Sequence, residues 1–311
     1  MSHSNSTAHL ISHEEVHEET DAKLLARTRS RLICAGDLPN VTVAQLLSLA
    51  DELSSSDLGR FLLRNRGLNA YWTHQVVTHV PGTFTPSTAE GLDYHLFERL
   101  PATLATRERF GIFRMELKAL MKPGITVASV PSGFMGDLFL LDYGHAPDIS
   151  FVGVDLDPAA LEGAKALAAE AGLANQLTLL QQDAWALELD GNVDVLVSNG
   201  LNIYEPDDER VVALYRLFRD SLRPGGTLIT SFLTPPPTIS AASPWNLQAI
   251  EPEAVALQTL LFVKIIEAKW QTFRTHTQTL EQLHRAGFAD IRFIDDRARM
   301  FPAVVARRPQ C

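Results

Sequence analysis

Hydrophobic and polar positions follow two different patterns along the chain, and the pattern changes near residue 123. From Asp21 to Met121, apolar residues recur at helical spacing, and Pro101 is placed to open one long helix. Thr42-Val43-Ala44-Gln45 and Ser87-Thr88-Ala89-Glu90 both have capping-box spacing before such runs, which predicts a helix start at each. The first part of the chain is therefore expected to be helical throughout.

After the helix stop at Lys122-Pro123-Gly124, short β-branched runs alternate with helical runs, which is typical of an α/β fold with a parallel sheet. Strands are predicted at Ile125–Val130, Ile149–Asp155, Leu177–Gln181, Val193–Ser198 and Gly226–Leu233. Helices are predicted at 158–172, 206–222, 252–269 and 280–286. The segments IRFID and AVVAR are joined by a short link and are expected to form an antiparallel hairpin at the edge of the sheet.

Composition and charge narrow the class of protein. Of the 311 residues, 46% are apolar and 21% are charged, which is ordinary for a globular protein with a sizeable core. The net charge of −10 argues against broad contacts with a phosphate backbone, so nucleic acid is not an expected partner. Cys34 and Cys311 form no disulfide framework, and no apolar run approaches membrane-spanning length. We expect a soluble cytoplasmic protein that has no membrane partner.

The polar first twenty residues contain His3, His9, His13 and His17 on a Ser-rich segment. This spacing favours a disordered tail over a metal-binding tract. The predicted organisation is therefore a disordered tail (1–20), an N-terminal helical lid or subdomain (21–122) and a sheet domain (123–311).

The stretch VASVPSGFMG, from Val127 to Gly136, is the first candidate for chemistry. It is predicted to form a strand, a turn of small residues and the start of a helix. Such a turn places backbone N–H groups at the carboxyl edge of a sheet, where nucleotide-like ligands bind. Asp155 ends the next strand at the spacing typical of a ribose-binding carboxylate. The pair predicts a site for a nucleotide-like ligand.

Further motifs follow in a recognisable order: FVGVDLDP, QQDAWAL, VSNGLNIYE, LRPGGTLITSF, LHRAGF and FPAVVAR. From Gly124 to Arg308 the chain resembles a class I S-adenosylmethionine (SAM)-dependent methyltransferase. The resemblance implies a Rossmann-like sheet of seven strands with an antiparallel last strand. It also implies SAM as cofactor or substrate, without a metal.

The resemblance implies the contacts of the adenosine half of SAM. Asp155 would bind the ribose hydroxyls, with Leu156 against the adenine face. Asp183 would accept from the adenine amino group, beside Ala184 and Trp185. The alternatives are that both acids only cap the next helix and that Trp185 only packs in the core.

The stretch Val127–Gly136, called the opening loop below, departs from the family's pattern where it would contact the methionine half of SAM. Its expected SAM-binding residues are Ser129, Pro131, Ser132 and Gly133. The family usually has an acid at the position of Ser129, so an electrostatic partner for the methionine ammonium is missing there. It usually has glycine at the position of Pro131, and proline removes a backbone donor and fixes φ. Adenosine recognition is therefore expected to be intact and methionine recognition to be changed.

The motif VSNGLNIYE offers candidate catalytic residues at the carboxyl end of a strand. Asn199 and Asn202 could orient an amine or a carboxylate, and Tyr204 could contact a sulfonium. Glu205 is a candidate base, although it could simply complement the dipole of the next helix. Asn199 could likewise serve only the turn with Gly200.

The helical lid adds two candidate catalytic aromatics. Tyr71 and Trp72 lie on a predicted helix and are expected to exclude water from SAM if the lid closes over it. His79 on the same helix is a second candidate base. Nearer the carboxyl end, Arg274 could bind a carboxylate or form a surface ion pair.

Three functional hypotheses follow from these residues. The first is methyl transfer from SAM to a small-molecule acceptor. The second is cyclisation of SAM itself to azetidine-2-carboxylate, with release of methylthioadenosine, as in the azetidine-2-carboxylate synthases of natural-product pathways that share this fold. The third is a SAM-binding protein without catalysis. The sequence leaves the methyl acceptor and the oligomeric state open.

Overall fold

The computed structural model describes residues 19–143, 148–269 and 272–310. The predicted disordered tail, residues 1–20, lies almost wholly outside this part of the chain, as do its four histidines. All further statements concern the described residues.

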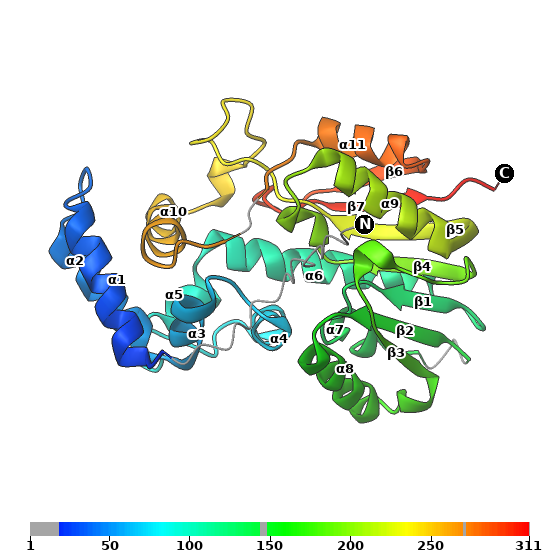
Figure 1. Cartoon of the computed structure of the whole chain (residues 1–311), viewed down its shortest axis with the longest axis horizontal. Coiled ribbons are helices and arrows are strands. Elements are labelled where there is room, and N and C mark those ends of the chain that lie inside the picture. Colours follow the sequence, from blue (N-terminus) through cyan, green and yellow to red (C-terminus); the bar gives the residue numbers. More distant parts are fainter. Residues whose placement is uncertain (1–18, 144–147, 270–271, 311) are drawn as a thin grey trace, which may run out of the picture.

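The predicted parallel sheet is present and has seven strands. They are β1 (Thr126–Ser129), β2 (Ser150–Asp155), β3 (Leu177–Gln181), β4 (Val193–Ser198), β5 (Leu222–Ser231), β6 (Ala289–Ile294) and β7 (Ala303–Arg307). Their order is β3-β2-β1-β4-β5-β7-β6, and β7 is antiparallel to both of its neighbours (Figure 1). This confirms the seven-stranded Rossmann-like class with an antiparallel last strand.

The strand order fixes where a ligand can bind. Within the sheet, β2 pairs with one edge of β1, and β4 pairs with the other edge of β1. The connections on the two sides therefore diverge between β1 and β4. In open α/β sheets such a switch point leaves a crevice beyond the carboxyl ends of the strands.

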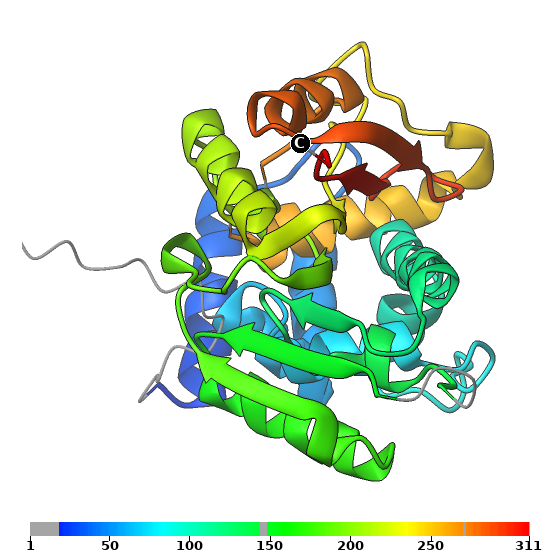
Figure 2. The same cartoon turned by 90° about the vertical axis from the view of Figure 1, so that its right-hand side faces the viewer.

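Helices cover both faces of the sheet (Figures 1 and 2). On one face, α6 (Pro101–Leu120), α7 (Gly136–Phe139) and α8 (Pro158–Glu170) share a core with Val127, Phe151 and other sheet residues. On the other face, α9 (Asp208–Ser221) and α11 (His276–Arg285) pack their apolar sides on the sheet. The nearly continuous apolar runs of β1 and β4 are explained by this two-sided burial.

The N-terminal helices form a separate cluster beside the sheet (Figure 1). They are α1 (Asp21–Ala35), α2 (Val43–Ser55), α3 (Asp57–Asn65), α4 (Ala70–Thr78) and α5 (Asp93–Glu98). Their core also contains Leu261, Ile265 and Ile266 from a later segment made of α10 (Pro252–Thr259) and a π-helix (Leu260–Ile265). The prediction assigned α6 to the N-terminal helical part, but α6 packs in the core of the sheet. The predicted domain boundary at residue 122 therefore stays a prediction.

One of the two predicted capping boxes is confirmed. The Thr42 hydroxyl accepts from the Gln45 N–H, and the Gln45 side chain accepts from the Thr42 N–H. The prediction at Ser87–Glu90 was wrong, because α5 begins only at Asp93. There the hydroxyls of residues 85, 87 and 88 bond to one another in a turn, which competes with helix formation.

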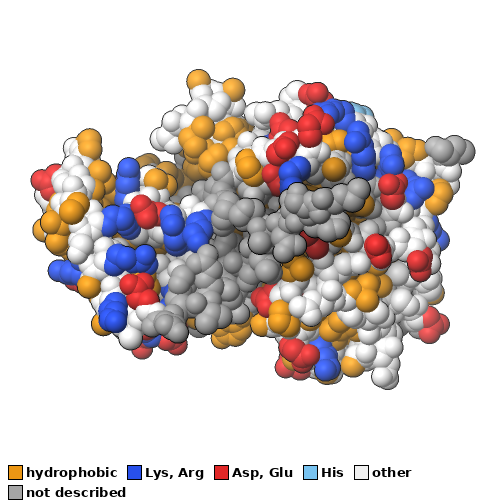
Figure 3. All heavy atoms as spheres, viewed as in Figure 1, with side chains coloured by type: hydrophobic (Ala, Val, Ile, Leu, Met, Phe, Trp, Pro, Cys, Tyr) orange, Lys and Arg blue, Asp and Glu red, His pale blue; other side chains and the backbone are white. Residues whose placement is uncertain are grey.

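The surface carries mixed charge in the view of Figure 3. Acidic and basic side chains lie interspersed over the described part of this face. No helix among the described residues is long and apolar enough to cross a membrane.

Candidate active site

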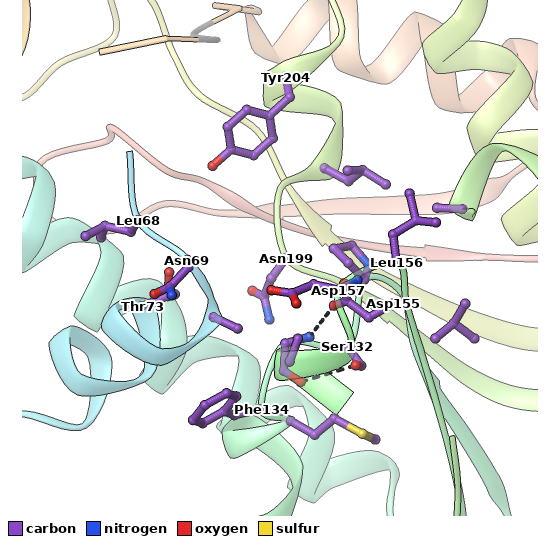
Figure 4. Close-up of a pocket in the computed structure, with 18 of the residues that line it drawn as sticks. Leu68, Asn69, Thr73, Ser132, Phe134, Asp155, Leu156, Asp157, Asn199 and Tyr204 are labelled. Atoms are coloured by element: carbon purple, nitrogen blue, oxygen red, sulfur yellow. Dashed lines mark hydrogen bonds between the residues drawn. The ribbon is translucent and has the colours of Figure 1, made fainter. Parts of the chain in front are cut away.

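A cavity of about 730 Å³ opens at the carboxyl ends of β1, β2 and β4. The helices α4 and α6 form the wall opposite the sheet (Figure 4). In the close-up, Asn69 and Thr73 lie on one side, Asp155 and Leu156 on the other, and Asn199 between them. Its volume lies within the range of about 300–1,000 Å³ typical of small-molecule sites.

Asp155 connects the cavity to the opening loop. One carboxylate oxygen accepts from the Gly133 N–H at 2.9 Å, and the other accepts from the Asp157 N–H at 3.0 Å (Figure 4). Burial raises the pKa of Asp155, and these backbone hydrogen bonds oppose the rise. Asp155 and Leu156 both line the cavity, and their contacts with adenosine stay a prediction from the resemblance.

Asp183, Ala184 and Trp185 also line the cavity, at the start of a short 3₁₀ helix (Ala184–Ala186). The Asp183 carboxylate accepts from the Trp185 N–H at 2.9 Å, so its capping role is real. The Trp185 ring packs against the core and lies 5.7 Å from the Arg210 guanidinium carbon. Capping and cavity lining therefore coexist in this segment.

One glycine in α8 and one at the end of the loop stretch Val127–Gly136 let neighbouring segments pack closely around this loop. A Cβ atom on Gly163 of α8 would lie 2.0 Å from the Phe134 ring, and one on Gly136 would lie 2.9 Å from His74. Pro131, Ser132 and Gly133 line the cavity as predicted. The loop is thus fixed between α8 and α4 before any ligand binds.

Ser129 is the exception among the predicted loop residues. It is 2% exposed, lies at the end of β1 between Gly153 of β2 and Val197 of β4, and does not line the cavity. The cavity lining does not support its assignment as a SAM-binding residue, which stays a prediction, because the chain enters the cavity only after β1 ends.

Asp137 is a functional candidate that the sequence interpretation missed. Its carboxylate lines the cavity, is 3% exposed and accepts from the Asn199 side-chain amide at 3.0 Å. Burial raises its pKa to about 6, although the bond from Asn199 and backbone N–H groups oppose the rise. The available signal was an acid directly after the glycine turn, at the start of the next helix.

Arg109 of α6 is the second missed residue. It is 8% exposed, lines the cavity and donates to the Ser231 hydroxyl at 3.2 Å. Among the described residues, nothing accepts from its Nε atom. Burial lowers its pKa to about 10, opposed by Tyr204, Asp296 and Asp137. Arg109 therefore stays charged at neutral pH and is suited to hold an anionic group.

The predicted catalytic residues of the motif VSNGLNIYE (197–205) separate into two groups. Asn199 and Tyr204 line the cavity, and burial raises the pKa of Tyr204. Asn202 does not line it: the residue is 2% exposed, and neither polar atom of its side chain bonds to a described residue, so its predicted role stays a prediction. Glu205 lines the cavity but accepts from the Asp207 N–H and pairs with Arg210 at 2.6 Å, so it lies at the start of α9 as its alternative role beside the helix dipole requires.

The predicted aromatic shield is not supported by the cavity lining, which includes neither Tyr71 nor Trp72, and it stays a prediction about a closed lid. Tyr71 is 47% exposed, and Trp72 packs into the N-terminal helical core. Helix α4 instead turns Ala70, Thr73, His74 and Val77 toward the cavity. His79 pairs with Glu98 at 2.6 Å in a different, smaller cavity, so it is not placed to act as a base.

Arg274 clamps the loop that carries Tyr204. It is 2% exposed and donates to the carbonyls of Asn202 and Glu205, at 2.8 and 2.7 Å, and to Asp208. The ion pair offered as an alternative is present, with the half-exposed Asp208, but Arg274 itself is buried and not on the surface.

Replacing Arg274 by Met is expected to lower the free energy of unfolding by about 3 kcal/mol, because two buried carbonyls lose their donor. Urea denaturation monitored by circular dichroism measures the change. The matched control is Arg285→Met, which removes an exposed pair with Glu209 and should leave the midpoint almost unchanged. Equal midpoints for both variants would contradict the clamp.

Comparisons with known proteins agree with this geometry. A family model described as a methyltransferase domain matches residues 135–226. The fold is similar to the apo form of the SAM-dependent methyltransferase SibL, with a TM-score of 0.50 and 16% identity over 93% of this chain and 94% of that chain. Residues 135–226 therefore match a methyltransferase domain, and the chain has the fold of class I SAM-dependent methyltransferases.

A closer relative has also been solved. The chain is 52% identical to a protein from Bordetella parapertussis described as a possible exported protein, with a TM-score of 0.87. The alignment covers 93% of this chain and 95% of that chain, so the two belong to one family within the methyltransferase fold. No curated protein matches the chain.

Proposed function

We propose that the protein is a SAM-dependent enzyme that transfers a methyl group to a small-molecule acceptor. The supporting observation is that one cavity collects the adenosine-side acids Asp155 and Asp183 together with Asn199 and Tyr204. The cavity residues fit SAM chemically, since the carboxylates that line it could accept from the hydroxyl and amino donors of SAM. When bound, SAM supplies an electrophilic carbon on its sulfonium.

The protein's own contribution is positioning and exclusion of water. Asp155 would accept from the ribose hydroxyls, with Leu156 and Trp185 beside the adenine ring. Tyr204 and Arg109 line the cavity on the β4–β5 side, and Arg109 would hold an anionic group of the acceptor. The walls from α4 and α6 would keep water from the reacting groups.

A second candidate, cyclisation of SAM to azetidine-2-carboxylate, is favoured by one specific observation. Ser129 replaces the usual acid, and Asp137 supplies a buried carboxylate of raised pKa instead. In this reaction Asp137 would accept a proton from the substrate's ammonium group. The freed amine forms a bond to Cγ as the carbon–sulfur bond breaks, and the electron pair leaves with sulfur in methylthioadenosine.

The purified protein incubated with SAM alone separates the candidates. For methyl transfer, SAM is expected to remain intact when bound and to become S-adenosylhomocysteine only after an acceptor is added. For cyclisation, methylthioadenosine and azetidine-2-carboxylate should appear in equal amounts. Mass spectrometry measures all four compounds, with heat-treated protein as the control for spontaneous breakdown. Absence of SAM binding by calorimetry would reject both reactions and also the non-catalytic SAM-binding alternative.

A small-molecule partner and a cytoplasmic location are parts of the same proposal. The relative from Bordetella parapertussis is described as a possible exported protein, so cell fractionation with an antibody against this chain is the direct measurement of its compartment.

A further inference from the structure

The methionine side of the cavity lacks an acid at the usual place. Ser129 ends β1 with a neutral side chain that is 2% exposed and does not reach the cavity. A ligand ammonium placed beyond β1 therefore finds no carboxylate on that strand.

A carboxylate is present eight residues later, by sequence number, at the start of α7. Asp137 lines the cavity and is 3% exposed. Asn199, at the end of β4, donates its amide N–H to one carboxylate oxygen at 3.0 Å, and backbone N–H groups of α7 also bond to the carboxylate. The side chain is thus held from both β4 and α7 in a fixed position.

The charge of Asp137 is not neutralised by an ion pair with any described residue. The buried cation Arg109 acts on Asp137 through its charge and opposes the rise of its pKa, but it donates to Ser231 and forms no ion pair with Asp137. A buried carboxylate without a cation is unfavourable, which is usually resolved by a partner or by protonation. A cationic ligand group in the cavity would supply the partner.

We propose that Asp137, oriented by Asn199, binds the α-ammonium group of SAM in place of the acid that is missing at Ser129. The assignment rests on the proposed SAM binding. A primary ammonium has three N–H donors, and a carboxylate that already accepts from one amide keeps lone pairs for it. The ammonium contact is thereby moved from the strand end to the first turn of the following helix.

The test compares ligands that differ only at the amino-acid end. Isothermal titration calorimetry near pH 8 measures S-adenosylhomocysteine, its analogue lacking the α-amino group, and 5′-methylthioadenosine against wild type and Asp137→Asn. Loss of a buried charge contact predicts about 30-fold weaker binding of S-adenosylhomocysteine. For each of the other two ligands, the affinities of wild type and Asp137→Asn should agree within about twofold, since neither ligand has the ammonium.

Asp157→Asn is the matched control, because Asp157 lines the adenosine side of the same cavity and caps α8. Any effect of that substitution should be equal for S-adenosylhomocysteine and methylthioadenosine, which share adenosine. Retained methylthioadenosine binding shows that Asp137→Asn is folded. An equal loss of all three ligands in Asp137→Asn overturns the ammonium assignment alone. If wild type binds none of them, SAM binding itself is wrong, and the assignment falls with it.

Discussion

Replacing Asp155 by Ala is expected to weaken binding of S-adenosylhomocysteine about 100-fold, which corresponds to roughly 3 kcal/mol. The carboxylate faces the cavity at the end of β2, where two ribose hydroxyls would donate to it. It also accepts from the Gly133 and Asp157 N–H groups, so the substitution releases the glycine turn as well. Hydrogen bonds to a charged acceptor are stronger than neutral ones, which is why one side chain has so large an expected effect.

Titration calorimetry with two ligands separates the ribose contact from the release of the loop. The wild-type protein should prefer methylthioadenosine to its 2′,3′-dideoxy analogue, and Asp155→Ala should lose most of that preference. Glu162→Gln on α8 is the control, since Glu162 is exposed and lies outside the cavity. A preference that survives unchanged in Asp155→Ala would show that Asp155 acts on the loop and does not contact ribose.

The sheet, and the position of Asp155 and Asp183 in one cavity, could be predicted from the sequence because their signals are local. Buried parallel strands read as apolar runs, and the acids at their ends sit at fixed distances from the glycine turn. The strand boundaries are close to the prediction for β3 and β4, whereas β5 begins earlier, at Leu222. Leu222 already pairs with Val193 of β4, and the register shifts before Thr227 pairs with Val195. The strand therefore includes the Arg-Pro-Gly-Gly turn sequence, which composition does not reveal.

The lid side could not be predicted in the same way. Helical periodicity tells which residues of α4 share a face, but not which face meets the sheet. Tyr71 and Trp72 were chosen for chemical type, whereas packing against α6 and α8 directs Thr73 and His74 to the cavity. Arg109 was missed for a similar reason, because an arginine inside an amphipathic helix looks like part of a solvated face.

The site also depends on contacts between distant segments. Asp137 and Asn199 are separated by 62 positions, and Arg274 holds carbonyls about seventy positions earlier in the chain, at separations of 72 and 69. Such contacts have no sequence spacing to detect. The sequence therefore predicts a departure at the methionine end, while the three-dimensional arrangement supplies Asp137 as the residue proposed to compensate for it.

Asp137→Asn is expected to stabilise the ligand-free protein at neutral pH. Burial raises the pKa of Asp137 to about 6, from 3.8 for an ordinary Asp. Above pH 6 the folded state must hold a desolvated carboxylate, which lowers the free energy of unfolding by about 3 kcal/mol. Asn has nearly the same shape without the charge, so the variant should be more stable by up to that amount.

The pH dependence has a definite sign. A raised pKa means that the folded state binds the proton more tightly, so wild type regains stability as pH falls from about 6 to about 4. The advantage of Asp137→Asn should therefore be largest above pH 6 and small near pH 4. Arg109 stays charged throughout this window because its pKa is about 10. His74 lines the cavity from α4 and has a pKa lowered by burial, so repeating the comparison in a His74→Gln background isolates residue 137.

Urea denaturation at several pH values, with and without saturating S-adenosylhomocysteine, measures both halves of this prediction. The ligand should stabilise wild type more than Asp137→Asn, because its ammonium pairs with the carboxylate only in wild type. The free energy of unfolding that wild type loses by burying the Asp137 carboxylate is then regained when the ligand binds, as expected for a side chain kept for function. A wild type that is more stable than the variant at pH 7.5 without ligand would show that the carboxylate is already compensated within the protein. The cavity would then have no unpaired charge to offer the methionine end of SAM.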